Sequence, residues 1–288
     1  MDGIFLINKP IGITSRSVCT KISKAFKEKK VGHVGTLDPF ASGLLIVAVG
    51  KCTKAVTFFD EAIKEYNATI QLGKETDTLD NTGKVIKEEP LKEYSLEEIN
   101  KAINSFLGKQ KQVPPMTSAI HINGRRLYEY AHEGKEVDRP SRDIEIFDIK
   151  MTSYDKKSGL LAFYCKVSKG TYVRTLGSDI AKKLGTIGYL EQLERVGVEP
   201  FNISETSSLE DVLEGKAKAY STYEILSRFI NVISFDDKKI EDIKNGKITY
   251  LENNIKNNRI LVVDSSNNAI AIYTRNQSGK LEFTRGLF

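Results

Sequence analysis

The sequence has few of the side chains that build metal sites and disulfides, with three cysteines, three histidines and no tryptophan among 288 residues. Cys19, Cys52 and Cys165 stand far apart and form no Cys-x-x-Cys pair. An odd number of dispersed cysteines is typical of reduced thiols that pack as small apolar side chains. The histidines are too few and too scattered to complete a structural zinc site. We therefore expect no metal ion.

The chain also lacks a long hydrophobic run, since its longest charge-free apolar stretch, residues 41–50, is too short to span a bilayer. Asp2 and the absence of a basic flank before the first short apolar run argue against a signal peptide. A composition of 40% hydrophobic and 28% charged residues is typical of a globular protein and excludes a collagen-like, coiled-coil or disordered chain. We expect a cytoplasmic protein with no membrane partner.

Common nucleotide, calcium and hydrolase motifs are missing as well. Gly50-Lys51 follows a predicted strand, but Cys52 stands where a P-loop has Ser or Thr. The segment 77–83 suggests a calcium loop, yet Leu79 stands where that loop needs an oxygen ligand. We therefore interpret the acidic residues Asp77 and Asp80 as turn-forming. No Gly-x-Gly-x-x-Gly, His-Glu-x-x-His or Gly-x-Ser-x-Gly motif is present, and we expect no cofactor.

The formal net charge of +5 is mild, but it is unevenly distributed. Residues 1–60 hold nine basic and four acidic side chains, and residues 101–142 hold eight and four. Residues 74–98, between them, hold four basic and eight acidic side chains. Two basic segments can form a phosphate-binding surface, although an ordinary solvated surface explains the counts equally well.

Local patterns predict helices and strands that mix without a regular βαβ alternation, which favours an α+β fold with helices packed on a mixed sheet. Predicted helices cover about 15–26, 96–107 and 173–184, and predicted strands cover 44–49, 66–72, 144–150 and 160–168. The first helix is predicted to bury Val18, Ile22, Ala25 and Phe26, and the second to bury Ile99, Ile103, Phe106 and Leu107.

The pattern of predicted elements changes after about residue 233. A short helix and turn are predicted over 240–248, followed by two β-rich runs at 260–264 and 269–273. The turn 265–268 joins these runs into a hairpin. We therefore expect two domains, 1–233 and a small β-rich domain at 234–288.

The segment Gly32-His33-Val-Gly35-Thr-Leu-Asp38-Pro39-Phe-Ala-Ser-Gly43 is the strongest candidate for chemistry. Its three glycines allow close approach of a ligand or positive φ angles, and Pro39 stiffens the chain after Asp38. A carboxylate held in this way at the edge of a strand can act as a nucleophile or a general base. The Asp-Pro pair is equally compatible with a simple turn.

Five spaced blocks decide between these interpretations, because together they resemble the TruB type of pseudouridine synthases. The blocks are Gly3–Ser15, the Asp38 loop, Lys64–Gly83, Gln112–Tyr128 and the pair Ser168–Thr175 with Leu193–Gly197. Residues 234–288 resemble, more weakly, the PUA RNA-binding domain that ends many members. The resemblance implies the pseudouridine synthase fold, with a mainly antiparallel sheet, and an insertion at about 108–142 that closes over RNA.

By this resemblance Asp38 is the essential catalytic aspartate. The implied reaction breaks the N-glycosidic bond of one uridine, position 55 in the T-loop of tRNA, rotates the base and rejoins it through carbon. The base must first leave its stack. Attack on the ribose, attack on the base and removal of a ribose proton are three open paths for the aspartate.

The resemblance also implies roles for the other site residues. Tyr66 packs on the flipped base, Arg174 pairs with the catalytic acid, and Leu193 lines the pocket. His33 fills space vacated in the RNA loop, and Tyr172 supports the site from behind. Lys9 supports the active-site loop, or alternatively contacts a phosphate.

The expected partner is the T-arm of tRNA, bound by a monomer. The sequence departs from the family near Met116-Thr117, at His121 and at His132, where members often carry an aromatic residue, Lys and Arg. These differences lower the expected charge of the RNA-closing segment. An RNA-binding or RNA-folding factor and a hydrolase with an aspartate nucleophile remain as alternative functions.

Overall fold

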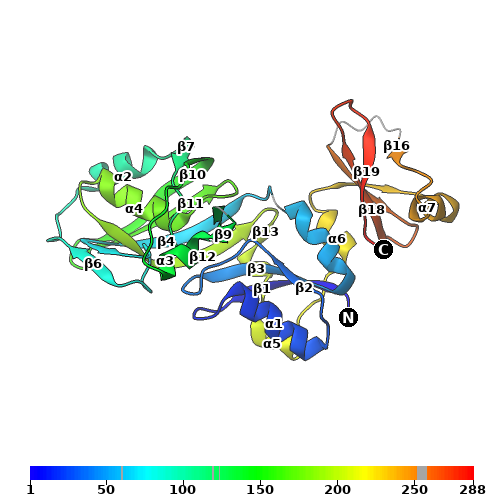
Figure 1. The fold of residues 1–288 in the computed structure, drawn as a ribbon, viewed down its shortest axis with the longest axis horizontal. Helices are drawn as coiled ribbons and strands as arrows, with labels where there is room; N and C mark the ends of the chain where they lie inside the picture. The colour runs from blue at the N-terminus through cyan, green and yellow to red at the C-terminus, as the bar shows by residue number, and fades with distance from the viewer. Residues whose placement is uncertain (60, 119, 123, 252–257) are drawn as a thin grey trace.

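The computed structural model describes residues 1–59, 61–118, 120–122, 124–251 and 258–288. Ala119, which belongs to one of the motif blocks, and the side chain of His132 lie outside what is described. Figure 1 shows two β-sheet units at opposite ends of the long axis, with most helices packed on the larger unit. None of the described helices is long and apolar enough to cross a bilayer.

The larger sheet contains ten of the described strands and is mainly antiparallel. Its order is β14 (Ser207–Ser208), β1 (Gly3–Lys9), β3 (Ser42–Val49), β12 (Gly188–Val198), β4 (Lys64–Leu72), β11 (Leu160–Val167), β10 (Arg142–Asp155) and β7 (Gly108–Gln112). β13 (Phe201–Asn202) pairs with β12, and β2 (Val31–Val34) pairs with β3. Only the β1–β14 and β3–β12 pairs are parallel. The predicted mixed, mainly antiparallel α+β fold is confirmed.

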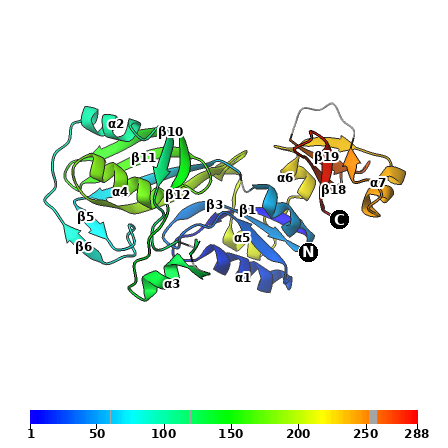
Figure 2. The ribbon, with the colours of Figure 1, turned by 45° about the horizontal axis from the view of Figure 1, so that its top comes forward.

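One face of this sheet is covered by the main hydrophobic core, which unites four helices with the alternating buried residues of the strands. These helices are α1 (Ser15–Phe26), α2 (Leu96–Asn104), α4 (Val173–Lys183) and α5 (Leu209–Leu213). In Figure 2, α2 and α4 lie together over the strands β10 to β12. On β4, Tyr66, Ala68 and Ile70 are buried while Asn67 between them is exposed, as expected for an antiparallel strand with one solvated face.

Two of the predicted helix faces differ from the structure. In α1, Ala25 is exposed and Cys19 is buried in its place, because the inward stripe follows Val18, Cys19 and Ile22. The helix α2 begins at a complete capping box on Ser95, but it ends at Asn104. Leu107, predicted to point inward, is 55% exposed because it lies beyond the last helical turn.

A second hydrophobic cluster covers the opposite face near the N-terminus, packed by the 3₁₀ helix η1 (Gly50–Phe59) and α6 (Thr222–Leu226). The same cluster includes residues of the smaller sheet, so the two units share packed side chains.

The smaller sheet has the order β15 (Asn231–Ser234), β17 (Arg259–Val263), β18 (Ala269–Arg275), β19 (Leu281–Gly286) and β16 (Tyr250–Leu251). It begins slightly before residue 234, because β15 pairs in parallel with β17. The helix α7 (Asp237–Lys244) packs on this sheet.

The remaining elements are small. They are the hairpin of β5 (Lys74–Thr76) and β6 (Val85–Glu88), the hairpin of β8 (His121–Ile122) and β9 (Arg125–Arg126), α3 (Leu127–His132) and η2 (Ile203–Glu205). The second hairpin and α3 lie in the segment 108–142. The division into a catalytic domain at 1–233 and an RNA-binding domain at 234–288 stays a prediction.

Candidate active site

The Asp38 loop connects β2 to β3 and is held from the side of α1. Ser15, the first residue of α1, is buried, and its hydroxyl bridges both polar backbone atoms of Leu37. The Leu37 N–H donates to the Ser15 Oγ at 2.9 Å, and the hydroxyl donates to the Leu37 carbonyl at 3.2 Å. Gly12 N–H donates to the carbonyl of Pro39 at 2.8 Å. Contacts on both sides of Asp38 therefore restrain the loop, while its side chain stays 36% exposed.

Arg174 faces this carboxylate from the first turn of α4. Its Nε lies 3.0 Å from Asp38 Oδ2, and its Nη2 lies 3.5 Å from Oδ1. The two residues are 136 positions apart in the chain, so the pair exists only because the fold joins them. The Arg174 side chain is only 4% exposed. Paired with two guanidinium nitrogens, the carboxylate is held in one orientation beside open space.

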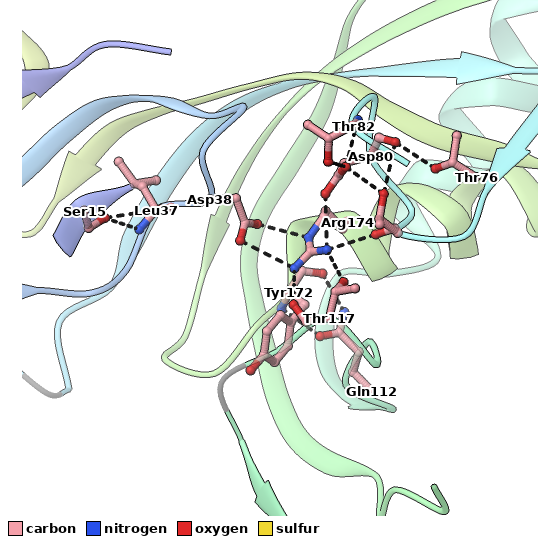
Figure 3. Close-up of polar contacts among 11 residues, drawn as sticks. Ser15, Leu37, Asp38, Thr76, Asp80, Thr82, Gln112, Thr117, Tyr172 and Arg174 are labelled. Atoms are coloured by element: carbon pink, nitrogen blue, oxygen red, sulfur yellow. Dashed lines mark hydrogen bonds and ion pairs between the residues drawn. The ribbon is translucent and has the colours of Figure 1, made fainter. Parts of the chain in front are cut away.

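Nη1 and Nη2 of Arg174 are also anchored by Asp80 and Thr117, as Figure 3 shows. Nη1 lies 3.2 Å from Asp80 Oδ2 and donates to the Thr117 hydroxyl at 2.6 Å. It also donates to the Thr78 carbonyl at 2.9 Å, while Nη2 donates to the Thr117 carbonyl at 3.0 Å. The guanidinium is therefore shared between two carboxylates and fixed by the segment 113–118.

Asp80 is itself buried and fully hydrogen-bonded. Its Oδ1 accepts hydrogen bonds from the hydroxyls of Thr78 and Thr82 at 2.7 and 2.5 Å, and from the Thr82 N–H at 3.0 Å. The interpretation of Asp80 as only a turn residue was therefore incomplete, because the same carboxylate closes a turn and pairs with Arg174. Asp77 fits the turn interpretation, since its carboxylate caps the Lys84 N–H at 2.9 Å.

The environment of Asp38 makes its carboxyl harder to ionise than an ordinary aspartate. Burial raises the pKa of the Asp38 carboxyl above its usual value, and the nearby Asp80 carboxylate raises it further. The charges of Arg174 and Lys9 oppose this shift without cancelling it. A carboxyl with a raised pKa is a stronger base once ionised, which suits a group that exchanges protons or attacks carbon.

Tyr66 and Leu193 lie on adjacent strands next to the loop. Tyr66 on β4 and Leu193 on β12 are each 8% exposed and belong to the main core cluster. In the β4–β12 ladder, Tyr66 stands opposite Arg195, and Leu193 stands opposite Ala68. Because alternate residues of a strand share a face, Tyr66 and Ala68 present one surface with Leu193 beside them. This surface is apolar apart from the Tyr66 hydroxyl.

Lys9 lies behind the loop and is completely buried. Its ammonium donates to the carbonyls of Pro10 and Ile13, both at 2.8 Å. Burial lowers the pKa of Lys9 to about 8, although the charge of Asp38 opposes that shift. These carbonyls lie between β1 and α1, in the segment whose Gly12 N–H binds the Pro39 carbonyl of the Asp38 loop. The buried ammonium therefore fits an indirect loop-supporting role better than a phosphate contact.

His33 and Tyr172 do not contact the Asp38 carboxylate. His33 on β2 lies between the Cys19 Sγ at 3.5 Å and the Thr36 hydroxyl at 3.3 Å, and burial lowers the pKa of its imidazole. The backbone of Tyr172 is fixed by Gln112, which accepts from its N–H at 2.8 Å and donates to its carbonyl at 3.1 Å. Figure 3 shows the Tyr172 ring directed away from Arg174.

Sequence reasoning missed Asp80, Thr117 and Arg195 as members of the site. Asp80 looked like an ordinary Asp-containing turn, and Thr117 fell at a position noted only as a departure. Arg195 was part of a recognised motif block without a role. Within the described residues, no group of three or more His, Cys, Asp or Glu side chains is arranged to hold a metal ion.

A family model described as TruB family pseudouridylate synthase (N terminal domain) matches residues 23–173. The chain is 38% identical over 284 residues to a protein named tRNA pseudouridine synthase B from Acholeplasma laidlawii (strain PG-8A), covering 98% of this chain and 99% of that protein. It is also 38% identical over 287 residues to the protein of the same name from Bacillus subtilis (strain 168), covering 95% and 93%.

Among solved structures, the fold is similar to a chain in a Cbf5-Nop10-Gar1 complex, with a TM-score of 0.75 at 20% identity. This match covers 99% of this chain and 85% of that one. A chain in a structure of an H/ACA RNP bound to a substrate RNA matches with a TM-score of 0.73, also at 20% identity. These two likenesses concern the fold. Taken with the sequence matches and the Asp38 loop, they lead to one conclusion: the chain belongs to the TruB family of pseudouridylate synthases.

Proposed function

We propose that this protein is a tRNA pseudouridine synthase that isomerises the uridine at position 55 in the T-loop. The observation that carries the proposal is the Asp38–Arg174 pair, in which a partly exposed carboxylate is held by a buried guanidinium beside the Tyr66 strand. The names of the relatives support the tRNA substrate. The T-loop position follows from the resemblance of the motif blocks.

In this reaction the bond between the uracil nitrogen and the ribose breaks, the base rotates, and a carbon of the base takes the place of the nitrogen. No atom is gained or lost overall. The carbon that joins the ribose gives up a proton, and the nitrogen that left the ribose takes up a proton. Asp38 is the one carboxylate of the site with an exposed side chain, since Asp80 is buried. Asp38 therefore meets the substrate, and Arg174 orients it and stabilises its charged form.

The target base has to leave the RNA stack before it reaches Asp38, at a cost of a few kcal/mol. The face of Tyr66 offers a stacking surface that recovers part of this cost, and Leu193 supplies apolar contact. Thr117 ties the segment 113–118 to Arg174, so the RNA-closing insertion at 108–142 is connected directly to the catalytic pair.

The proposal includes the T-arm of tRNA as the partner, a monomer as the active state and the cytoplasm as the location. It needs neither a metal ion nor a cofactor, because Asp38 and Arg174 supply the charges that the reaction uses. The smaller sheet, residues 234–288 in the sequence prediction, contributes RNA contacts as a PUA-like domain.

Replacing Asp38 by Asn tests the proposal. The variant keeps the shape of the side chain but removes the carboxylate, so pseudouridine formation on an unmodified tRNA transcript should fall by at least about 1,000-fold. Binding of the tRNA should change little, because an anionic carboxylate does not bind the phosphates that supply most of the affinity for RNA. Asp179→Asn, on the same helix as Arg174 and outside the site, is the matched control and should keep full activity.

The same assay separates the alternatives. Pseudouridine formation leaves the mass of the RNA unchanged, whereas an aspartate-nucleophile hydrolase releases uracil or cleaves the chain. A product of lower mass, or full turnover by Asp38→Asn, would contradict the proposal. Full cellular function of Asp38→Asn would favour an RNA-folding role instead.

A further inference from the structure

Arg195 lies on β12 between the two strands that carry the active-site residues. On one side, the parallel pairing of β12 with β3 places Arg195 opposite Gly43, at the end of the Asp38 loop. On the other side, the antiparallel pairing with β4 places it opposite Tyr66. Arg195 thus lies between Gly43 on β3, which follows the Asp38 loop, and Tyr66 on β4.

The guanidinium of Arg195 is bound to both ends of the Asp38 loop. Its Nε donates to the carbonyl of Leu44 at 2.8 Å, and its Nη2 donates to the carbonyl of Gly35 at 2.9 Å. The positive charge of Arg195 also acts on the neighbouring Tyr66 hydroxyl, where it opposes the rise in pKa that burial causes. One side chain therefore connects the start of the loop to its end, at the position in the sheet opposite Tyr66. A guanidinium is suited to this because its donors are fixed in one planar fork.

Arg195 is 1% exposed, so it cannot touch a bound RNA in this conformation. The ion pairs of the described residues include none to Arg195, in contrast to Arg174. A buried cation whose hydrogen bonds go to backbone carbonyls, with no carboxylate paired to it, costs folding free energy. Such a cost is typical of a residue kept for the geometry it imposes.

The loop glycines fit around this side chain. A Cβ on Gly35 would lie 3.2 Å from Arg195 Nη1, which is tight enough to displace the guanidinium slightly. A Cβ on Gly43 would lie 2.3 Å from the Arg195 carbonyl oxygen. Two of the three glycines that first marked the segment as unusual therefore make room for Arg195, from opposite ends of the loop.

We propose that Arg195 is a positioning residue, which sets the place of the Asp38 carboxylate relative to Tyr66 by holding Gly35 and Leu44 together. The inference rests on the proposed function, since the consequence of positioning is measured in pseudouridine formation. Arg195 acts through the loop backbone and makes no contact with the reacting uridine.

Arg195→Lys tests the inference, because an ammonium keeps the charge but loses the planar fork that binds both carbonyls. The rate of a single turnover on tRNA, with enzyme in excess, should fall by about 100-fold, since displacing a reacting group by about 1 Å has an effect of this size. The Kd for tRNA should stay within about twofold. A change in rate without a change in binding is the signature of lost positioning.

Ile225→Ala is the matched control for lost stability. Ile225 is fully buried in α6 within the second cluster, so its truncation lowers the melting temperature without touching the loop. It should leave the single-turnover rate unchanged. The inference is wrong if Arg195→Lys retains a rate within about threefold of the unmodified protein, or if Ile225→Ala loses as much activity.

Gly35→Ala provides a second test that does not depend on whether Arg195→Lys folds. Its added methyl group should shift the guanidinium and lower the single-turnover rate, and in the double variant the two effects should combine to less than their sum. An unchanged rate in Gly35→Ala would overturn the inference. If the unmodified protein forms no pseudouridine at all, it is the proposed function that fails.

Discussion

At the scale of single residues, the site depends on how the guanidinium of Arg174 is divided between Asp38 and Asp80. Both carboxylates lie within 3.2 Å of a guanidinium nitrogen, so neither receives the full benefit of the charge. Asp80 also accepts three hydrogen bonds at Oδ1, whereas Asp38 relies on Arg174. Burial and the charge of Asp80 together therefore raise the pKa of Asp38, because the shared guanidinium does not fully offset them.

This raised pKa predicts the pH dependence of activity. In the proposed reaction the ionised form of Asp38 is the active one, so the single-turnover rate should fall as the pH drops through the pKa of Asp38. Because that pKa is raised, the fall should begin at a higher pH than for an ordinary aspartate, whose pKa is about 3.9. The measurement is the rate of pseudouridine formation between about pH 4 and pH 8.

In Asp80→Asn, the fall in rate at acidic pH (the acidic limb of the pH profile) should move to lower pH. The substitution removes the neighbouring negative charge that raises the pKa of Asp38. The plateau rate should fall as well, since Arg174 loses one of its anchors. Asp77→Asn, in the same turn but bound only to the Lys84 N–H, is the control and should leave the limb in place. A limb that moves to higher pH in Asp80→Asn would show that this electrostatic account is wrong.

At the scale of elements, the parallel pairing of β3 with β12 brings the Asp38 loop close to β4, the strand that carries Tyr66. This pairing is short: Ser42 pairs with Glu194, and Gly43 pairs with Arg195. Gly43 has a φ angle of +107°, and the β12 backbone passes where a Cβ would stand. The close approach of two backbones at this point requires glycine.

Gly43→Ala should therefore destabilise the protein by about 3 kcal/mol or more, from backbone strain and overpacking together. Gly215→Ala is the matched control, because Gly215 also has a positive φ, of +73°, but nothing lies within 4 Å of its added methyl group. That variant should lose only about 1 kcal/mol. Urea unfolding measures both values, and equal losses in the two variants would contradict the close-approach argument.

At the scale of the whole molecule, the two sheet units are packed against each other and not merely linked. Leu261, Val263, Ile272 and Leu287 of the smaller unit belong to the same buried cluster as Ile4 and Leu6 of β1. Deleting the smaller unit would expose this apolar surface and disturb the larger unit. The charge contribution of each unit is therefore better tested by substitution than by truncation.

The basic surplus of residues 101–142 should contribute more to the salt dependence of tRNA binding than residues 234–288, which hold nine basic and seven acidic side chains. Lys109 and Lys111 are exposed on the edge strand β7. The last residue of this strand, Gln112, accepts a hydrogen bond from the N–H of Tyr172, which precedes α4. Replacing both by Gln should lower the slope of log K against log salt by about 0.7 to 0.9 for each phosphate that these lysines neutralise.

The matched control is Lys238→Gln with Lys280→Gln, two exposed positions in the smaller unit. This pair should change the slope by less than half as much as the β7 pair. Filter binding at several salt concentrations gives both slopes. A larger change from the control pair would mean that the smaller unit dominates the binding of phosphates.

The local elements of this protein could be predicted because their signals are local. The capping box at Ser95, the apolar stripe of Val18 and Ile22, and the alternation along β4 depend on residues a few positions apart. Some errors fell at element ends, such as Leu107, where one more helical turn changes which side is buried. Two whole strands, β1 and β12, were not among the predicted elements. Asp38 could be found for the same reason, since glycines and a proline frame it within a single loop.

The sequence by itself therefore determined the most strongly patterned helices and strands, the mainly antiparallel α+β class and the family, together with Asp38 as the candidate acid. Only the tertiary structure decided how the charges around that acid are shared. Asp80 meets Arg174 across 94 positions, and Arg195 meets Gly35 across 160. Such pairs depend on strand order and register, which place distant residues opposite each other. A turn aspartate and a strand arginine look ordinary until the sheet joins them to the catalytic loop.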